Sequence, residues 1–470
     1  MEECKTMDKC KVAQEDLHRG LKERHIQLIA IGGVIGVGLF LGSASAIKTA
    51  GPGILLAYLL VGIVVFFIMR ALGEIAVIYP VSGSFSQYAS TFLGSKYGYI
   101  TGWNYWYQWV VGCMCEITAV GLYMKFWYPD IEQWIPALAA LICMTVVNLV
   151  AVKFYGEFEF WFALIKVVAI VGMILIGSLM ILFGIGNGGV VVGISNLWTN
   201  GGFLPFGIQG VLMSLVMVTF AYTGSEGIGL TAGEAKDPTK TLPSAIDKMF
   251  WRVLIFYVGA LFVILSIYPW NEIGTIGSPF VATFKKLGIS GAAAIINFIV
   301  VTAALSSCNA GIYSSGRFLY SMALRGEAPA CFSKLNSSCV PARGIFGTVL
   351  VILIGVILNY VAPAQVFVYV TSLNVTGALW TWLMILLTQL KFRQGLTPEE
   401  VGNLKYRMPG SPYTNWLGIA YLLLITVIMF FNEDTRIALY LAPLWFGLLY
   451  LTYNMFVAKN SSAATINNAK

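Results

Sequence analysis

Two glycine-rich stretches interrupt apolar segments of the chain, and both could expose backbone groups to a ligand. They are residues 32–39 (GGVIGVGL) and residues 220–230 (FAYTGSEGIGL). Each glycine costs a helix about 1 kcal/mol relative to alanine. Inside a membrane, the backbone can unwind only where it lines a cavity or is buried in protein. The alternative is close helix packing through small residues.

The two stretches also resemble each other, because 35–39 reads IGVGL and 226–230 reads EGIGL. They lie five apolar segments apart, an odd number, so a second copy of the same unit would be inverted. Paired interrupted helices in corresponding positions of two halves indicate a transporter with its binding site near the middle of the membrane.

The ends of interrupted helices bind charged groups of opposite sign. Free amides at the start of a half-helix attract a carboxylate, and free carbonyls at the end of one attract an ammonium group. A molecule that carries both groups a few ångströms apart is an α-amino acid. Polar solutes of other kinds are alternative substrates.

Lys166 lies within the apolar segment 158–184, away from any predicted loop. A charged lysine there is costly, and an ionisable residue in a membrane is a functional candidate by default. We therefore predict that Lys166 carries a coupling proton. The alternative is that its long side chain snorkels to the cytoplasmic interface.

Glutamates in apolar segments are the next candidates. Glu226 lies inside the second glycine-rich stretch, where it could shape the cavity or cap a half-helix. Glu116 could be a polar group in the cavity or part of a buried hydrogen bond between helices. Glu74 reads as an interfacial anchor or the partner of a loop arginine. The aromatic run 103–109 (WNYWYQW) reads as an interfacial belt.

The composition places these residues in an all-α integral membrane protein. Of 470 residues, 58% are hydrophobic and only 11% are charged, whereas soluble proteins carry about 25% charged residues. This excludes a water-soluble enzyme and a disordered chain, and the runs are too long for an outer-membrane barrel. Twelve apolar runs predict twelve transmembrane helices: about 27–48, 53–78, 98–127, 133–152, 158–184, 205–232, 250–270, 291–319, 344–361, 365–390, 415–431 and 437–457.

The basic residues indicate the orientation. With the N-terminus placed in the cytoplasm, 23 of the 29 lysines and arginines fall in cytoplasmic segments and five in outer loops. This asymmetry predicts a multi-pass protein of the plasma membrane with both termini in the cytoplasm. It also explains the net charge of +7, so no nucleic-acid partner is expected beside the lipid bilayer.

Cysteine and histidine usage argues against catalysis. The eight cysteines form no CxxC pair, and the two histidines, His18 and His25, precede the first helix. Neither a disulfide framework nor a metal site is predicted. We expect no enzyme activity and no cofactor, with a proton as coupling ion.

The runs divide the chain into five parts. We expect a cytoplasmic N-terminal segment (1–26), a ten-helix core (27–390) with repeats at about 27–184 and 205–390, a cytoplasmic loop (391–414), two additional helices (415–457) and a cytoplasmic tail (458–470). The oligomeric state is not predicted.

Ordered motifs from about residue 17 to 457 carry a resemblance to a known family. They are HRGL (18–21), residues 31–42, GE (73–74), PVSGSF (80–85), GWNYW (102–106), residues 160–166 and GSE (224–226) through AGEAKDP (232–238). In this order, the chain resembles bacterial amino-acid permeases of the amino acid–polyamine–organocation superfamily.

The resemblance implies a LeuT-like fold of two inverted five-helix repeats plus two helices. It also implies a substrate site. Backbone at Ile35, Gly36, Val37 and Gly38 would hold the α-carboxylate; carbonyls of Phe220, Ala221 and Thr223, beside Gly224 and Glu226, would hold the amino group; Phe220 would gate the site; and Lys166 would replace a sodium ion. Val37 departs from the family, in which threonine is common.

We therefore expect uptake of amino acids across the plasma membrane, with neutral amino acids and proton symport favoured. An obligate exchanger on the same fold and a permease for cationic amino acids are alternatives. A nutrient receptor is disfavoured because the predicted cytoplasmic loops are only about 20–30 residues long.

Overall fold

The computed structural model describes residues 35–81, 84–150, 155–185, 187–230, 238–276, 278–286, 291–336 and 340–457. The predicted N-terminal segment, residues 27–34 of the first predicted helix and the tail lie outside these ranges. Every regular element in them is a helix.

The longer helices follow the apolar runs of the sequence. Their bounds are α4 (Gly42–Ala50), α5 (Ile54–Ile78), α7 (Ser95–Met124), α8 (Trp134–Val150), α9 (Tyr155–Phe183), α11 (Gly207–Tyr222), α13 (Pro238–Ile267), α16 (Ala292–Leu324), α17 (Ala342–Val361), α18 (Val366–Gln394), α20 (Tyr413–Phe431) and α21 (Glu433–Thr452).

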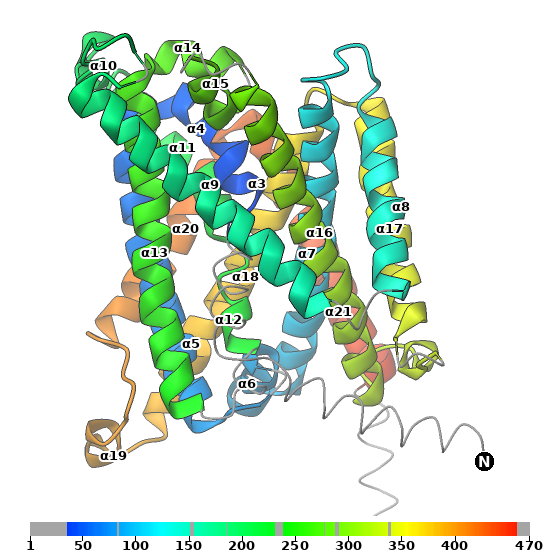
Figure 1. Ribbon diagram of the computed structural model, residues 1–470. Coiled ribbons are helices and arrows are strands. Elements are labelled where there is room, and N and C mark those ends of the chain that lie inside the picture. Colours follow the sequence, from blue (N-terminus) through cyan, green and yellow to red (C-terminus); the bar gives the residue numbers. More distant parts are fainter. Residues whose placement is uncertain are drawn as a thin grey trace, which may run out of the picture.

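Shorter helices join or cap the long ones. They are α3 (Val37–Phe40), η1 (Gly51–Gly53), α6 (Ser84–Leu93), α10 (Asn196–Thr199), α12 (Gly227–Leu230), α14 (Trp270–Ile276), α15 (Pro279–Lys286), η4 (Ala330–Ser333), α19 (Pro398–Gly402) and η5 (Tyr453–Val457). In Figure 1, α10, α14 and α15 lie at one end of the bundle, and α6 and α19 lie at the other.

The outer surface of the bundle is apolar. Large side chains such as Leu350, Leu444 and Leu423 are more than 60% exposed. Exposure of so much apolar surface to water is unfavourable, whereas its contact with lipid is favourable. Eight stretches in the described part of the chain are long and apolar enough to cross a membrane. The expected count of twelve crossings stays a prediction.

Helix α7 shows why a hydropathy threshold finds fewer membrane spans than the twelve apolar runs predict. It has 30 residues, long enough to cross a bilayer, but it is rich in tryptophan, tyrosine and polar residues. These lower its mean hydropathy. Its glycine, asparagine and cysteine face is buried against other helices, and polar groups in a membrane are tolerated in this setting.

Irregular backbone occurs at two places, at residues 35–36 before α3 and at residues 223–226 between α11 and α12. We call them the first and the second interruption; α3, α11 and α12 are labelled in Figure 1. The part of the chain before Ile35 lies outside the described residues. Helix α3 begins after Gly36, which has extended backbone. Helix α11 ends at Tyr222, and α12 begins only at Gly227. Between them Gly224 has φ +91°, a conformation that favours glycine. The interruption predicted within residues 220–230 is confirmed, because it lies between Tyr222 and Gly227.

Candidate functional site

The two interruptions lie directly against each other. A Cβ atom built on Gly38 would come within 2.6 Å of the Cα atom of Ala221, and one built on Gly42 would come within 3.0 Å of the Met217 sulfur. Glycine is therefore required at residue 38 for the backbones of α3 and α11 to approach so closely. The fold thus brings together the two segments that the sequence analysis paired.

A carboxyl group from another helix faces the first interruption. Ile35 and Val37 are buried, and Oε1 of Glu116 lies 3.0 Å from the Cβ position of Gly36. The Glu116 carboxyl group accepts a hydrogen bond from the backbone of Val37. Its other oxygen, Oε2, is buried without a hydrogen-bond partner in the described part of the chain. The Glu116 carboxyl group thus lies at the start of α3, next to Gly36.

Lys166 is completely buried beside the same carboxyl group. Its Nζ donates to Oγ of Ser307 on α16 at 3.4 Å, and the charges of Glu159 and Glu116 both act on it. The Glu159 carboxylate accepts a hydrogen bond from Ser306, at 3.0 and 3.1 Å to its two oxygens. A fully buried ammonium group among α7, α9 and α16 does not fit a snorkelling side chain.

The carbonyls at the end of α11 already have partners within the protein. The Phe220 carbonyl accepts from the amide and the hydroxyl of Thr223, at 3.1 and 2.8 Å. The Ala221 carbonyl accepts from the Tyr257 hydroxyl at 3.0 Å. A carbonyl has two lone pairs, so an ammonium group would share these oxygens or displace their donors.

Glu226 is fully buried and links the second interruption to two other helices. One carboxylate oxygen accepts from Gln108 of α7 at 2.6 Å and from the amide of Gly224 at 3.2 Å. The other accepts from the Trp382 indole of α18 at 3.0 Å. These bonds hold the irregular backbone in place, which is the capping alternative considered for Glu226.

The interpretation of residues 103–109 as an interfacial belt is wrong for its central members. Asn104, Tyr105 and Trp106 are buried, and the Asn104 amide donates to the Gly377 carbonyl at 2.8 Å. The aromatic rings pack between helices, because α7 is surrounded by α16, α17 and α18.

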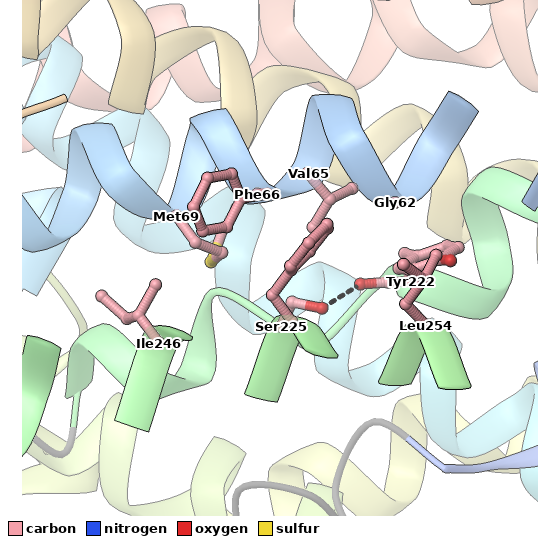
Figure 2. A pocket seen from close by; sticks show the side chains of 9 residues that line it. Gly62, Val65, Phe66, Met69, Tyr222, Ser225, Ile246 and Leu254 are labelled. Carbon is pink, nitrogen blue, oxygen red and sulfur yellow. Dashed lines mark hydrogen bonds between the residues drawn. The ribbon is translucent and has the colours of Figure 1, made fainter. Parts of the chain in front are cut away.

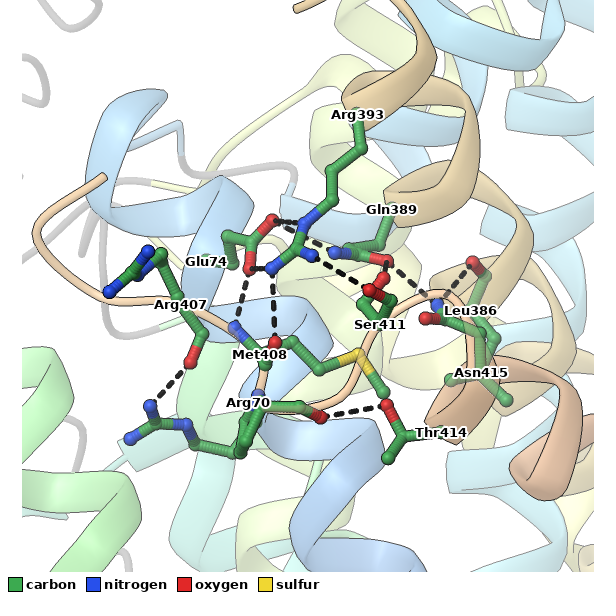
Figure 3. A network of polar contacts seen from close by, with 11 residues as sticks. Arg70, Glu74, Leu386, Gln389, Arg393, Arg407, Met408, Ser411, Thr414 and Asn415 are labelled. Carbon is green, nitrogen blue, oxygen red and sulfur yellow. Dashed lines mark hydrogen bonds and ion pairs between the residues drawn. The ribbon is translucent and has the colours of Figure 1, made fainter. Parts of the chain in front are cut away.

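Glu74 lies one turn from the end of α5, in a polar network shown in Figure 3. Its carboxylate pairs with Arg393 at 2.6 Å and accepts from Gln389 at 2.8 Å and from the amide of Met408. The prediction that Glu74 pairs with an arginine is confirmed, but Arg393 belongs to the last turn of α18 and not to a loop.

Two pockets lie beside the second interruption. Figure 2 shows a narrow apolar pocket between α5 and α13, where Ser225 donates to the Tyr222 carbonyl at 2.6 Å. The other pocket has a volume of about 120 Å³ and is lined by polar and apolar side chains in similar measure. It reaches Phe220 from the side of α4 and the start of α21, so of these two pockets it is the one that touches a residue of the expected substrate site.

Several residues around the interruptions escaped the sequence analysis: Gln108, Glu159, Tyr257, Ser307 and Trp382. Their partners are 36 to 156 residues away in the chain. One signal was present, since Asn104 and Gln108 are four residues apart and share a helix face.

Comparison with known proteins gives the family. The model of the amino acid permease family matches residues 25–464. The uncharacterized amino acid permease YtnA of Bacillus subtilis (strain 168) is 58% identical, with 97% of this chain and 99% of the relative covered. The probable threonine/serine transporter YbxG of the same strain is 48% identical (96% and 98% covered). The aromatic amino acid transport protein AroP of Escherichia coli O6:H1 is 43% identical (96% and 98% covered).

Coverage is nearly complete on both sides, and the relatives are permeases, which move their substrates and do not transform them. Together with the apolar helices, this makes the chain a multi-pass membrane protein and a transporter, not an enzyme: it belongs to the amino acid permease family.

Proposed function

We propose that this protein imports neutral amino acids across the plasma membrane by proton symport, with both termini in the cytoplasm. The observation that carries the proposal is the buried Lys166, which lies with Glu116 beside the start of α3. A titratable group next to a predicted carboxylate site is where proton binding and substrate binding can influence each other.

The substrate carboxylate binds at the amides of Val37 and Gly38 in this proposal. Glu116 supports it, because its carboxyl group already accepts from the backbone of Val37. An incoming amino acid therefore replaces one carboxylate by another at the helix start. Its ammonium group binds at the carbonyls of Phe220, Ala221 and Thr223.

The preference for neutral amino acids is supported by two relatives. YbxG is described as a probable threonine/serine transporter and AroP as an aromatic amino acid transport protein. Their named substrates differ widely in size but carry no net charge. We propose the same class here, without choosing a side chain.

Lys166 carries the coupling proton in this proposal. When protonated, its ammonium group is stabilised by Glu116 and Glu159 and ties α9 to the first interruption. Loss of the proton toward the cytoplasm removes that attraction and favours release of the amino acid. The summed charge of Lys166, Glu116 and Glu159 thus changes during each transport cycle.

The test is uptake of labelled amino acids by proteoliposomes with and without an inward proton gradient. We expect alanine, serine, threonine and phenylalanine, but not lysine, to accumulate only with the gradient. Lys166→Ala should bind substrate and lose gradient-driven accumulation, whereas Lys48→Ala, a change in an exposed lysine of α4, should behave as wild type.

Other results would overturn parts of the proposal. Counterflow without a proton gradient, together with the absence of net uptake, would identify an exchanger. Preferred uptake of lysine would identify a permease for cationic amino acids. Full gradient-driven accumulation by Lys166→Ala would remove Lys166 from proton coupling.

A further inference from the structure

The polar cavity of about 120 Å³ lies between α4, α11, α18 and the start of α21. Phe220, the predicted gate, forms one part of its wall, and Asp434 and Thr435 of α21 form another. A water molecule needs about 10–15 Å³ of such volume, so the cavity has room for a small polar molecule. The expected substrate site contributes only Phe220 to its lining.

The hydroxyl groups around this cavity are oriented as acceptors. Five of them donate their single hydrogen to a carbonyl of the chain within six residues of their own position, at 2.6 to 3.1 Å. They belong to Thr49, Ser214, Thr371, Ser372 and Thr435. A hydroxyl that has donated its hydrogen keeps only acceptor capacity, so the wall is suited to a ligand that donates hydrogen bonds.

Asp434 adds a negative charge to this wall. It is the one charged residue lining the cavity, it is exposed, and no ion pair of its carboxylate occurs within the described ranges. The nearby Arg436 donates instead to the Phe430 carbonyl at 2.7 Å. Acceptors plus one carboxylate form a site for a cation with N–H donors.

We propose that this cavity is an outer binding site for a free amino acid, which Asp434 and the hydroxyl groups hold by its ammonium group before Phe220 admits it to the interrupted helices. The inference rests on the proposed function. The same chemistry would also suit a hydrated sodium ion, and the experiment separates the two ligands.

The experiment measures initial uptake of labelled alanine and phenylalanine by intact cells that express Asp434→Asn. We expect KM to rise about fivefold with an unchanged maximal rate, since a partly exposed charge pair contributes up to about 1 kcal/mol. The matched control is Glu433→Gln. It removes an acidic residue from the same first turn of α21 but does not line the cavity, so its KM should stay within about twofold of wild type.

The amount of protein at the cell surface is measured for each variant to exclude a folding defect. A KM that is unchanged in Asp434→Asn, or raised equally in Glu433→Gln, would overturn the inference. A rise in KM that vanishes when choline replaces sodium would assign the cavity to sodium instead and would also overturn it. Failure of the proposed function would appear differently, as absence of amino-acid uptake by the wild type.

Discussion

Gly36 and Gly38 at the first interruption differ in what a side chain would meet. A Cβ on Gly36 would lie 3.0 Å from the end of the flexible Glu116 side chain, whereas one on Gly38 would lie 2.6 Å from the backbone of Ala221. A side chain can move aside, but the backbone of a packed helix cannot move without shifting its neighbours. The second substitution must therefore separate α3 from α11.

We predict that Gly38→Ala lowers the free energy of unfolding by about 1–3 kcal/mol and abolishes substrate binding. Gly36→Ala should retain the fold and weaken binding only partly. Thermal unfolding in detergent with and without amino acid measures both effects. Equal behaviour of the two variants would contradict the close approach of the interrupted helices.

Glu116→Gln tests whether an internal carboxylate competes with the substrate. The amide keeps an oxygen acceptor beside Gly36 but cannot ionise, so it never repels the substrate carboxylate. At a pH where the wild-type carboxyl group is ionised, amino-acid binding should be about tenfold stronger in the variant, which corresponds to about 1.4 kcal/mol. Equilibrium binding of labelled substrate measures it, and Glu272→Gln, a change in an exposed glutamate of α14, is the control. Weaker binding would show that Glu116 assists the substrate rather than competing with it.

At the scale of elements, the segment 404–412 ties α5 to α18. Arg393 of α18 pairs with Glu74 of α5, and its Nη2 also donates to the Met408 carbonyl at 3.0 Å. Glu74 accepts from the amide of Met408, and Arg70 donates to the Arg407 carbonyl (Figure 3). The backbone of this segment is thus held on both sides by buried or half-buried charges.

We predict that Glu74→Gln loosens this segment and exposes it to trypsin. Hydrogen bonds to charged groups contribute about 1.5–3 kcal/mol, so the open state should become at least about tenfold more populated. Cleavage after Lys405 or Arg407, followed by mass spectrometry of the fragments, measures it. Glu399→Gln, in the exposed helix α19, should be cut at the wild-type rate, and equal rates in both variants would contradict the role of Glu74.

The sequence predicts the elements well where hydropathy or glycine content decides them. Within the described ranges, each of the twelve apolar runs overlaps a helix, and the interruption between Tyr222 and Gly227 follows from the glycines of that stretch. Helix ends differ where the chain leaves the apolar layer. Helix α13 begins at Pro238, not near residue 250, and α16 continues to Leu324, because helical hydrogen bonding does not end where hydropathy falls.

The contacts of the candidate site were harder to predict. Lys166 and Glu226 could be singled out because a charge in an apolar run is expensive. Their partners Ser307, Gln108 and Trp382 are ordinary polar or aromatic residues on distant helices. Which helix faces meet depends on packing of the whole bundle, and a single sequence does not contain that information.

At the scale of the whole molecule, charge and apolar surface are separated along the membrane normal. Apolar side chains cover the outside of the bundle, and the predicted cytoplasmic segments contain most of the basic residues. Insertion favours the orientation that leaves Lys and Arg in the cytoplasm. An even number of crossings would place both termini there.

The cysteines allow this orientation to be tested without removing any residue. Cys4, Cys10, Cys331 and Cys339 lie outside the apolar runs, all in predicted cytoplasmic segments, and Cys331 is exposed. We expect a membrane-impermeant maleimide to leave the wild type unlabelled in intact cells and to label it after permeabilisation. Asn187→Cys, in the turn between α9 and α10, should be labelled in intact cells, because α10 lies at the end of the bundle opposite α6 and α19 (Figure 1). Labelling of the wild type from outside, or protection of Asn187→Cys, would reverse the orientation and with it the direction in which Lys166 releases its proton.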